Sequence, residues 1–274
     1  MPIVIILILI MIGYFCWDPS RAIVPWDIPL LGRPILWYGF LFALGFFLSY
    51  LVLFELIKNR RDNPKKIADA LTLYAVLGAV IGARIFDVLF YENWHQILHD
   101  PLSIFRVWEG GLASHGGVLG ILVAFAIFQR RYRYFSNLEL LDLAVIPAGL
   151  AAGFIRIGNF FNQEILGTLT NVPWAVVFGH PADGSLPVPR HPVQLYEAIF
   201  YLLVFGVMWS LRKWWKRAGR ATGCFLMLVF GFRFFIEFFK EEQSVWLVHF
   251  PLTMGQLLSI PFMILGCYLL FRKS

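Results

Sequence analysis

Charged residues are scarce in this sequence. Only 15% of its 274 residues are Asp, Glu, Lys or Arg, whereas a soluble domain carries about 25%. In contrast, 59% of the residues are hydrophobic and the mean hydropathy is +0.71. A soluble core could not bury this much apolar surface. The composition therefore excludes an ordinary soluble protein and indicates that lipid is the solvent for much of the chain.

Cysteine is scarce too, with only Cys16, Cys224 and Cys267. All three lie in apolar runs, which argues against a disulfide framework and a metal cluster. No metal-ligand spacing occurs, so neither a metal nor another cofactor is expected. The net charge of +6 comes from short basic clusters between apolar runs. That pattern sets membrane orientation, so a nucleic-acid partner is not expected.

Long apolar runs make up most of the sequence. A membrane-spanning helix needs about 20 mostly apolar residues. Seven runs meet or approach that length: 36–57, 67–90, 112–129, 138–155, 194–211, 222–239 and 252–271. The sequence therefore predicts an all-α polytopic membrane protein with seven transmembrane helices. A shorter apolar run, 3–17, could form an eighth span, an interfacial helix or an uncleaved signal-like extension.

Basic residues mark every second connection between these runs. They are Lys58, Arg60, Arg61, Lys65 and Lys66, then Arg130, Arg131 and Arg133, then Arg212, Lys213, Lys216, Arg217 and Arg220, and finally Arg272 and Lys273. Because connections rich in Lys and Arg stay in the cytoplasm, the C-terminus is expected there. The alternate connections are expected on the outer side of the membrane.

The longest outer connection, about 156–193, follows the fourth run. It includes the alternating stretch 174–178, which is typical of a strand. We therefore expect a small extracytoplasmic head domain, with a short hairpin, between the fourth and fifth helices. Residues 1–35 would form an N-terminal apolar segment and outer arm, and residues 36–274 the transmembrane domain.

The densest polar cluster opens this connection. It contains Arg156, Asn159, Asn162, Gln163 and Glu164, interrupted by apolar residues at or just outside membrane depth. Polar groups in lipid are costly unless they are satisfied, so these side chains should face the interior or a wet cavity. Ionisable residues at such a depth are functional candidates. The simpler alternative is a hydrogen-bond network that seals the end of a loop.

Two more arginines lie within apolar runs. Arg233 has Glu237 four residues on, so the two could pair. Together with Arg156, however, Arg233 would make a clamp for a phosphate group, because guanidinium offers a planar fork of donors. Arg84 has Asp87 three residues on, and a structural ion pair is the stronger interpretation there.

Further polar residues lie near the outer ends of the spans. His115 precedes two glycines at the start of the third run and could shuttle a proton, although a lone histidine is more often structural. Tyr38 opens the first run and could donate a hydrogen bond into a site. The block 190–197 leads into the fifth run and brings charged groups to the outer rim. The block 254–259 suits contact between helices.

In combination, these blocks resemble the prolipoprotein diacylglyceryl transferases of bacterial inner membranes. The resemblance spans residues 36–261 and rests on Trp37-Tyr38-Gly39, His115-Gly116-Gly117, the stretch from Arg156 to Gly167, Arg190-His191-Pro192, Phe232-Arg233 and Met254-Gly255-Gln256. Two positions depart from the family pattern: Ile155 stands where glycine is usual, and Val229 where tyrosine is usual.

The resemblance implies a reaction and its partners. The family transfers the diacylglyceryl group of phosphatidylglycerol to the thiol of a lipobox cysteine in a preprolipoprotein, forming a thioether and releasing glycerol phosphate. It implies a multi-pass protein of the bacterial inner membrane, surrounded by membrane lipid, with its active site towards the outer face. Arg156, Asn159, Glu164 and Gly167 carry over as residues that bind phosphatidylglycerol. Tyr38, His115 and Arg233 carry over as catalytic residues.

The chemistry of these side chains suits that reaction. Two arginines could stabilise the charge on the leaving phosphate. The thiolate is the attacking species, and His115 is a hypothesis for the base that forms it. A thiol near two arginines could also lose its proton without a dedicated base.

Two other classes of membrane protein are alternatives to the transferase. A transporter or lipid channel would explain arginines within the membrane, but it would not need His115, Asn159 and Glu164 together. The chain also lacks the internal repeat of many transporters. A structural scaffold would leave the polar cluster without a purpose.

Overall fold

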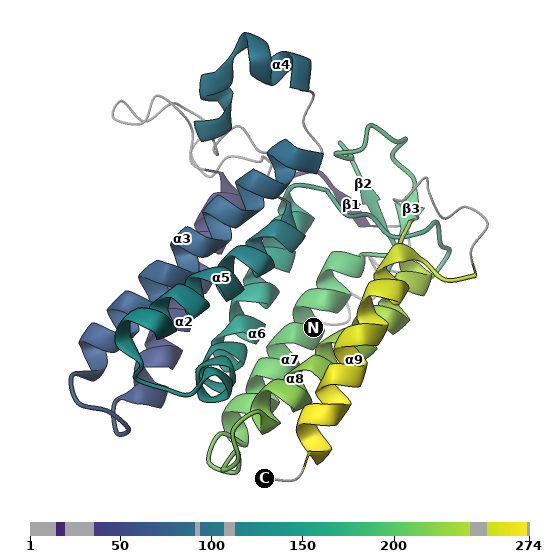
Figure 1. Cartoon of the computed structure of the whole chain (residues 1–274). Coiled ribbons are helices and arrows are strands. Elements are labelled where there is room, and N and C mark those ends of the chain that lie inside the picture. The colour runs from purple at the N-terminus through teal and green to yellow at the C-terminus, as the bar shows by residue number, and fades with distance from the viewer. Residues whose placement is uncertain (1–14, 20–35, 91–93, 107–112, 242–250, 273–274) are drawn as a thin grey trace. The chain divides into compact units, whose positions relative to one another are not determined.

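The structure is a computed structural model that describes residues 15–19, 36–90, 94–106, 113–241 and 251–272. Helices make up most of the described chain (Figure 1). The residues fall into two compact units. The first unit comprises 1–49 and 145–274, and the second comprises 50–144.

Six helices in the described ranges are long and apolar enough to span a membrane. They are α2 (Trp37–Ile57), α3 (Pro64–Phe90), α6 (Asn137–Phe161), α7 (Val193–Ser210), α8 (Arg220–Ile236) extended by the 3-10 turn η3 (Glu237–Phe239), and α9 (Met254–Phe271). The chain is therefore an integral membrane protein, and six of the expected runs are confirmed as helices of spanning length.

The third expected run also forms a helix, α5 (Ser114–Tyr132), but this helix is not among the six. Its polar ends explain why. His115 lies in the first turn, and Arg130 and Arg131 lie in the last turn, so the average over the helix is less apolar than its centre.

In the second unit, α3 and α5 pack at backbone contact through glycines. A Cβ atom at Gly82 would lie 2.3 Å from the carbonyl oxygen of Gly116, and one at Gly120 only 2.0 Å from that of Gly78. Residue 78 opposes 120 and residue 82 opposes 116, so the two helices run antiparallel. Small residues four apart let helix backbones approach in this way within membranes.

The same unit confirms the structural interpretation of Arg84. Its Nη1 lies 3.0 Å from Oδ2 of Asp87. Its Nε and Nη2 donate to the carbonyl oxygens of Ile104 and Ser103, at 2.9 and 2.8 Å. Arg84 therefore ties α3 to η1 (Pro101–Phe105), a short turn that follows α4 (Trp94–His99).

The first unit carries a small sheet of β1 (Phe15–Trp17), β2 (Val176–Phe178) and β3 (Pro189–Arg190). Strands β2 and β3 are antiparallel, which confirms the expected hairpin. Strand β1 joins β2 in parallel. It closes the apolar run 3–17, so a helix through the end of that run is wrong. Residues 3–14 of this run lie outside the described residues.

Aromatic packing attaches this sheet to α6. The Trp17 ring stacks on Phe160 at 4.7 Å, and its Nε1 donates to the Phe160 carbonyl at 3.1 Å. Phe160 also belongs to a buried cluster with Leu166, Val176 and Phe178. The packing of the Trp17 ring against α6 therefore explains the position of β1, and the apolar run before it does not.

Helix α6 continues six residues beyond the expected end at 155. Arg156 and Asn159 therefore lie on its last turns rather than in a loop. The helix stops where Gln163 and Ile165 adopt left-handed backbone, with φ of 54° and 57°. Such a conformation is uncommon for residues other than glycine. It is held here because the buried Gln163 side chain accepts from the His180 amide at 2.7 Å.

Helices α8 and α9 lie side by side in the first unit (Figure 1). Their backbones also approach through small residues, since a Cβ atom at Gly223 would lie 2.8 Å from the Gly266 carbonyl oxygen. At the start of α9, Thr253 and Gln256 form a reciprocal capping box. This cap fixes the residue at which α9 begins. Its Thr253 also contacts Glu237, which follows α8.

Candidate active site

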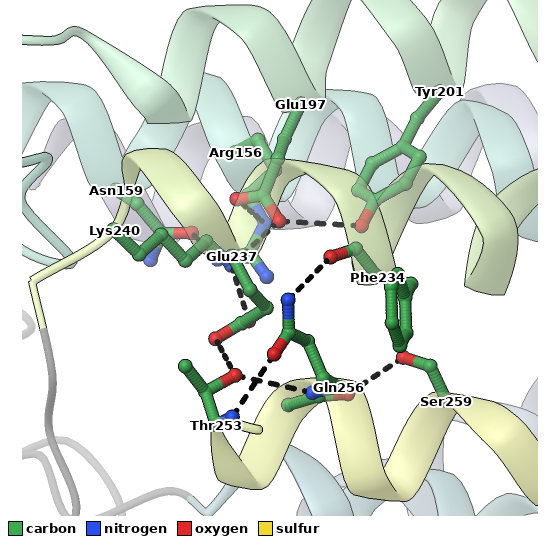
Figure 2. A network of polar contacts seen from close by, with 11 residues as sticks. Arg156, Asn159, Glu197, Tyr201, Phe234, Glu237, Lys240, Thr253, Gln256 and Ser259 are labelled. Carbon is green, nitrogen blue, oxygen red and sulfur yellow. Dashed lines mark hydrogen bonds and ion pairs between the residues drawn. The ribbon is translucent and has the colours of Figure 1, made fainter. Parts of the chain in front are cut away.

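Polar side chains from α6, α7 and the end of α8 meet inside the first unit (Figure 2). On α7, Gln194, Glu197 and Tyr201 lie three and four residues apart and therefore share one face of the helix. Gln194 and Glu197 are fully buried. A buried carboxylate is stable only if it is paired, so Glu197 requires positive partners.

Glu197 has two cationic partners. Its Oε2 lies 3.0 Å from Nε of Arg156, and its Oε1 lies 2.9 Å from Nζ of Lys240. The Tyr201 hydroxyl donates to Oε1 at 3.5 Å. The Lys240 side chain is only 9% exposed. Figure 2 shows the Glu197 carboxylate between these groups. We call Arg156, Glu197 and Lys240 the charge cluster.

A second carboxylate, Glu237, extends the charge cluster towards α9. Its Oε1 lies 3.4 Å from Nζ of Lys240, and its Oε2 accepts from the Thr253 hydroxyl at 3.3 Å. A Cβ atom at Gly255 would lie only 2.2 Å from the Glu237 carboxyl carbon. Glycine at 255 is therefore required for Glu237 to lie against the start of α9.

A hydrogen-bond chain links Arg156 to the loop after α6. Its Nη1 donates to Oδ1 of Asn159 at 3.2 Å, and Nδ2 of Asn159 donates to Oε1 of Glu164 at 2.6 Å. Asn162 donates to the same Glu164 oxygen at 3.3 Å. Asn159 thus holds Arg156 from one side while Glu197 holds it from another.

Tyr38 joins these residues from the first turn of α2. A Cβ atom at Gly158 would lie 2.9 Å from Cδ2 of Tyr38, so glycine at 158 gives the ring its place on α6. The phenol lies close enough to Arg156 and Glu164 to interact with both charges. Four of the expected residues, at 38, 156, 159 and 164, are therefore neighbours.

Arg233 on α8 differs from Arg156. Within the described part of the chain it forms no hydrogen bond or ion pair. The pairing with Glu237, which the sequence left open as an alternative, does not form, and Glu237 pairs with Lys240 instead. The Arg233 charge still acts on the Glu197 carboxylate. The residue is partly exposed. Arg233 is therefore a cation beside the charge cluster whose hydrogen-bond donors are available to a ligand.

Gly167 lies where two backbone segments cross. A Cβ atom there would be 2.3 Å from the His191 carbonyl oxygen, and Arg190 Nη1 donates to the Gly167 carbonyl at 3.2 Å. Gly167 also pairs as an isolated bridge with Lys240. Close packing alone requires glycine at this position, and contact with a substrate stays a prediction.

His115 lies in the first turn of α5, in the second unit, and its side chain is exposed. It is thus in a different unit from the other expected site residues. Its assignment as a base stays a prediction from the sequence.

The sequence reasoning missed Glu197 and Lys240 as members of the site. Glu197 was expected among charged groups at the outer rim, but its side chain is fully buried. The signal was the spacing of Gln194, Glu197 and Tyr201, which places three polar groups on one face of an apolar helix. Lys240 gave no such signal: Glu237 lies three residues before it, but Glu197, the partner that brings Lys240 into the charge cluster, lies far away in the sequence.

Fold and site together define a polytopic helical membrane protein that buries arginine, lysine and carboxylate side chains at the ends of its helices. In the described ranges no group of three His, Cys, Asp or Glu side chains is placed to hold a metal ion. Such an arrangement is suited to binding an anionic group by charge and hydrogen bonds.

Comparisons with known proteins specify the class further. The family model described as prolipoprotein diacylglyceryl transferase matches residues 26–272. The chain is 48% identical over 218 residues to a phosphatidylglycerol–prolipoprotein diacylglyceryl transferase of Protochlamydia amoebophila, covering 76% of this chain and 57% of that relative. It is 44% identical to the enzyme of that name from Chloroherpeton thalassium, covering 95% of both chains. The chain belongs to the prolipoprotein diacylglyceryl transferase family.

Proposed function

We propose that the chain transfers the diacylglyceryl group of phosphatidylglycerol to a cysteine thiol of a prolipoprotein. The observation that carries this proposal is the pair of arginines, one held by the charge cluster and one with available donors. The identity of the substrates is inferred from the family. The site contains groups suited to binding the phosphate of phosphatidylglycerol.

The reaction replaces one bond with another. A sulfur–carbon bond forms at the terminal glyceryl carbon, and the bond from that carbon to a phosphate oxygen breaks. The electron pair goes to that oxygen, so glycerol phosphate leaves with an added negative charge, and the thiol proton passes to a base. Because charge develops on the phosphate, preorganised cations would stabilise the transition state.

The two arginines would have different parts in this step. Arg233 has available donors and would bind the phosphate directly. Arg156 is oriented by Glu197 and Asn159, so it presents its remaining donors without a reorganisation cost. Glu164 and Tyr38 would line the same space and orient the head group, with Gly167 beside them.

The finer membrane topology belongs to this proposal. Helix α3 spans, and α5 lies antiparallel to it from Gly82 opposite Gly116 to Tyr74 opposite Phe128, whose rings meet at 5.5 Å. At 1.5 Å per residue, that contact covers about 12 Å along α3 and about 18 Å along α5. A helix packed along a spanning helix in this way supports α5 as the seventh span.

Seven spans also bring all four basic connections to one side. With α5 crossing, the clusters that follow α2, α5, α7 and α9 lie in the cytoplasm, together with the C-terminus. The sheet and its loops then form an extracytoplasmic head domain between α6 and α7. The charge cluster lies towards the outer face of a bacterial inner membrane, where the lipobox of a preprolipoprotein would meet it.

The test is transfer by purified, full-length protein in vesicles that contain phosphatidylglycerol, with a lipobox peptide as acceptor. The readout is the diacylglyceryl mass added to the peptide. Arg233→Ala should lose about 100-fold or more, as removal of one preorganised donor does. Arg220→Ala is the matched control, because Arg220 is exposed on the same helix. Equal transfer by both folded variants would overturn the role of Arg233, and no transfer by the wild type would overturn the function.

A further inference from the structure

The surface of the first unit carries an apolar groove of about 540 Å³. It lies between α7 and α8, and we call it the α7–α8 groove. Its walls are Tyr196, Ile199, Phe200 and Leu203 of α7 and Phe232, Phe235, Ile236 and Phe239 of α8 with η3. Each set recurs at i, i+3, i+4 and i+7, so each forms one stripe along its helix.

The α7–α8 groove faces away from the charge cluster. Glu197 and Tyr201 lie on the buried side of α7, whereas Ile199 and Leu203 are 59% and 61% exposed. The floor of the groove is closed by Phe200 and Phe232, whose rings stack at 3.9 Å. Because both helices are of membrane-spanning length, an open apolar groove on this side contacts the hydrocarbon of the bilayer.

Polar groups stand at one end of this groove, next to β2 and β3. Trp174 Nε1 donates to the Tyr196 hydroxyl at 2.7 Å, and that hydroxyl lies 3.2 Å from Nδ1 of His191. An indole nitrogen can only donate. The Tyr196 oxygen therefore accepts from Trp174, which leaves its O–H proton for another acceptor, and among the described residues His191 Nδ1 is the acceptor within reach.

This pairing favours one tautomer of His191. A neutral imidazole that accepts at Nδ1 carries its proton on Nε2. Burial lowers the pKa of His191, which keeps the ring neutral at pH 7. Within the described residues, Nε2 has no hydrogen-bond partner, so it is a donor available at the end of the groove. The ring is fixed edge-on against Phe239 at 5.1 Å.

We propose that the α7–α8 groove binds one acyl chain of a membrane glycerolipid, whose ester carbonyl oxygen accepts a hydrogen bond from His191 Nε2. An acyl chain suits the apolar walls, and its ester group supplies the acceptor at their polar end. The volume lies within the range of about 300–1,000 Å³ for small-molecule sites.

This lipid site is separate from the proposed transfer, because it requires no reaction at the charge cluster. The test uses full-length protein in vesicles of phosphatidylcholine, with a trace of phosphatidylcholine that carries a diazirine on its acyl chain. After irradiation, labelled residues are mapped by mass spectrometry. We expect labelling of Ile199 and Phe235 several-fold above Ile264, an equally exposed residue on α9 (65%). Uniform labelling of all exposed apolar residues would overturn the proposal.

Two variants sharpen the test. Leu203→Trp fills the groove and should abolish the excess labelling, whereas Ile264→Trp should leave it unchanged. His191→Phe keeps a ring but removes the donor and should weaken labelling, and His191→Gln, which retains an N–H donor, should restore part of it. Equal labelling in wild type and His191→Phe would overturn the anchoring by His191.

A second arm replaces the probe with phosphatidylglycerol that carries the same diazirine. Labelling by both probes supports a site for glycerolipid in general. Labelling by phosphatidylglycerol alone would assign the groove to the transfer substrate and overturn the separate site.

Discussion

Glu197 illustrates how one buried residue organises the site. Its carboxylate compensates Arg156 and Lys240, which come from α6 and from the end of η3. Neither cation would be stable at this depth without a counter-charge. The residue acts on the proposed phosphate only through these neighbours, so we regard it as a positioning residue.

Glu197→Gln is therefore expected to destabilise the protein. It removes the ion-pair partner of Arg156 and one of the two carboxylates beside Lys240. Removing one partner of a buried pair costs about 3–5 kcal/mol. Glu55→Gln is the matched control, because Glu55 pairs with Lys58 at a site where its side chain is 44% exposed, and such pairs contribute under about 1 kcal/mol. Thermal unfolding in detergent measures both. Equal losses would contradict the role given to the charge cluster.

The variant His115→Gln tests whether His115 is the base that removes the thiol proton. If His115 takes the thiol proton, transfer at neutral pH should fall by about 100-fold or more, with no change in thermal stability. His180→Gln is the control, since His180 is an exposed histidine of the first unit. Near-normal transfer by the His115 variant would exclude the base role and favour a thiol ionised by the arginines.

At the residue scale the sequence predicted the part of the polar cluster whose members are near neighbours along the chain. Arg156, Asn159 and Glu164 lie close together along the chain, so their chemistry and their proximity were both visible. Glu197 and Lys240 reach Arg156 only through the packing of three helices. A pattern along one helix shows which face is polar but not which residue it meets.

Among the elements, α3 and α5 depend most on a backbone contact. Gly120 leaves no room for a side chain, because a Cβ atom would lie 2.0 Å from the Gly78 carbonyl oxygen. A backbone atom cannot rotate away, so the helices would have to separate.

Gly120→Ala should therefore lower stability by about 1–3 kcal/mol, the usual cost of overpacking. Gly231→Ala in α8 is the control, since nothing lies within 4 Å of a Cβ atom there. That change should be neutral or stabilising by up to about 1 kcal/mol, as for alanine in a helix. Thermal unfolding measures the stability of the two variants. An equal change in stability would contradict the close contact between α3 and α5.

The helices themselves were predictable, because long apolar runs have few alternatives. Their ends were less so. Helix α6 continues to Phe161 and ends before the left-handed backbone at Gln163, while the change from apolar to polar residues after position 155 suggested an earlier end. Strand β1 was missed because Phe15–Trp17 closes an apolar run, and its pairing with Val176–Phe178 is set by packing far along the chain.

For the whole molecule, the number of spans can be tested by accessibility. The exposed residue Leu102 lies before α5, and the exposed residue Arg131 lies in its last turn. Leu102→Cys and Arg131→Cys are placed one at a time in a protein whose native cysteines are replaced by alanine. With seven spans, a membrane-impermeant maleimide should label residue 102 from the outer side of right-side-out vesicles, and residue 131 only after permeabilisation. Labelling of both from one side would contradict α5 as a span.

At this scale the sequence predicted the family, which the comparisons confirm over residues 26–272. Blocks of residues in a fixed order identify a family even when their contacts are unknown. Order along the chain does not say which blocks meet. Only the fold showed that the first turn of α2 reaches Gly158 and that the end of η3 reaches Glu197.

The most direct test of the central claim is the stoichiometry of the reaction. Purified wild-type protein would be incubated with phosphatidylglycerol and a lipobox peptide, and both products would be quantified by mass spectrometry. We predict that glycerol phosphate and the diacylglyceryl thioether appear in equal amounts, and that a peptide with serine in place of the cysteine yields neither. Lipid consumed without a thioether, or a thioether formed without release of glycerol phosphate, would contradict the proposed function.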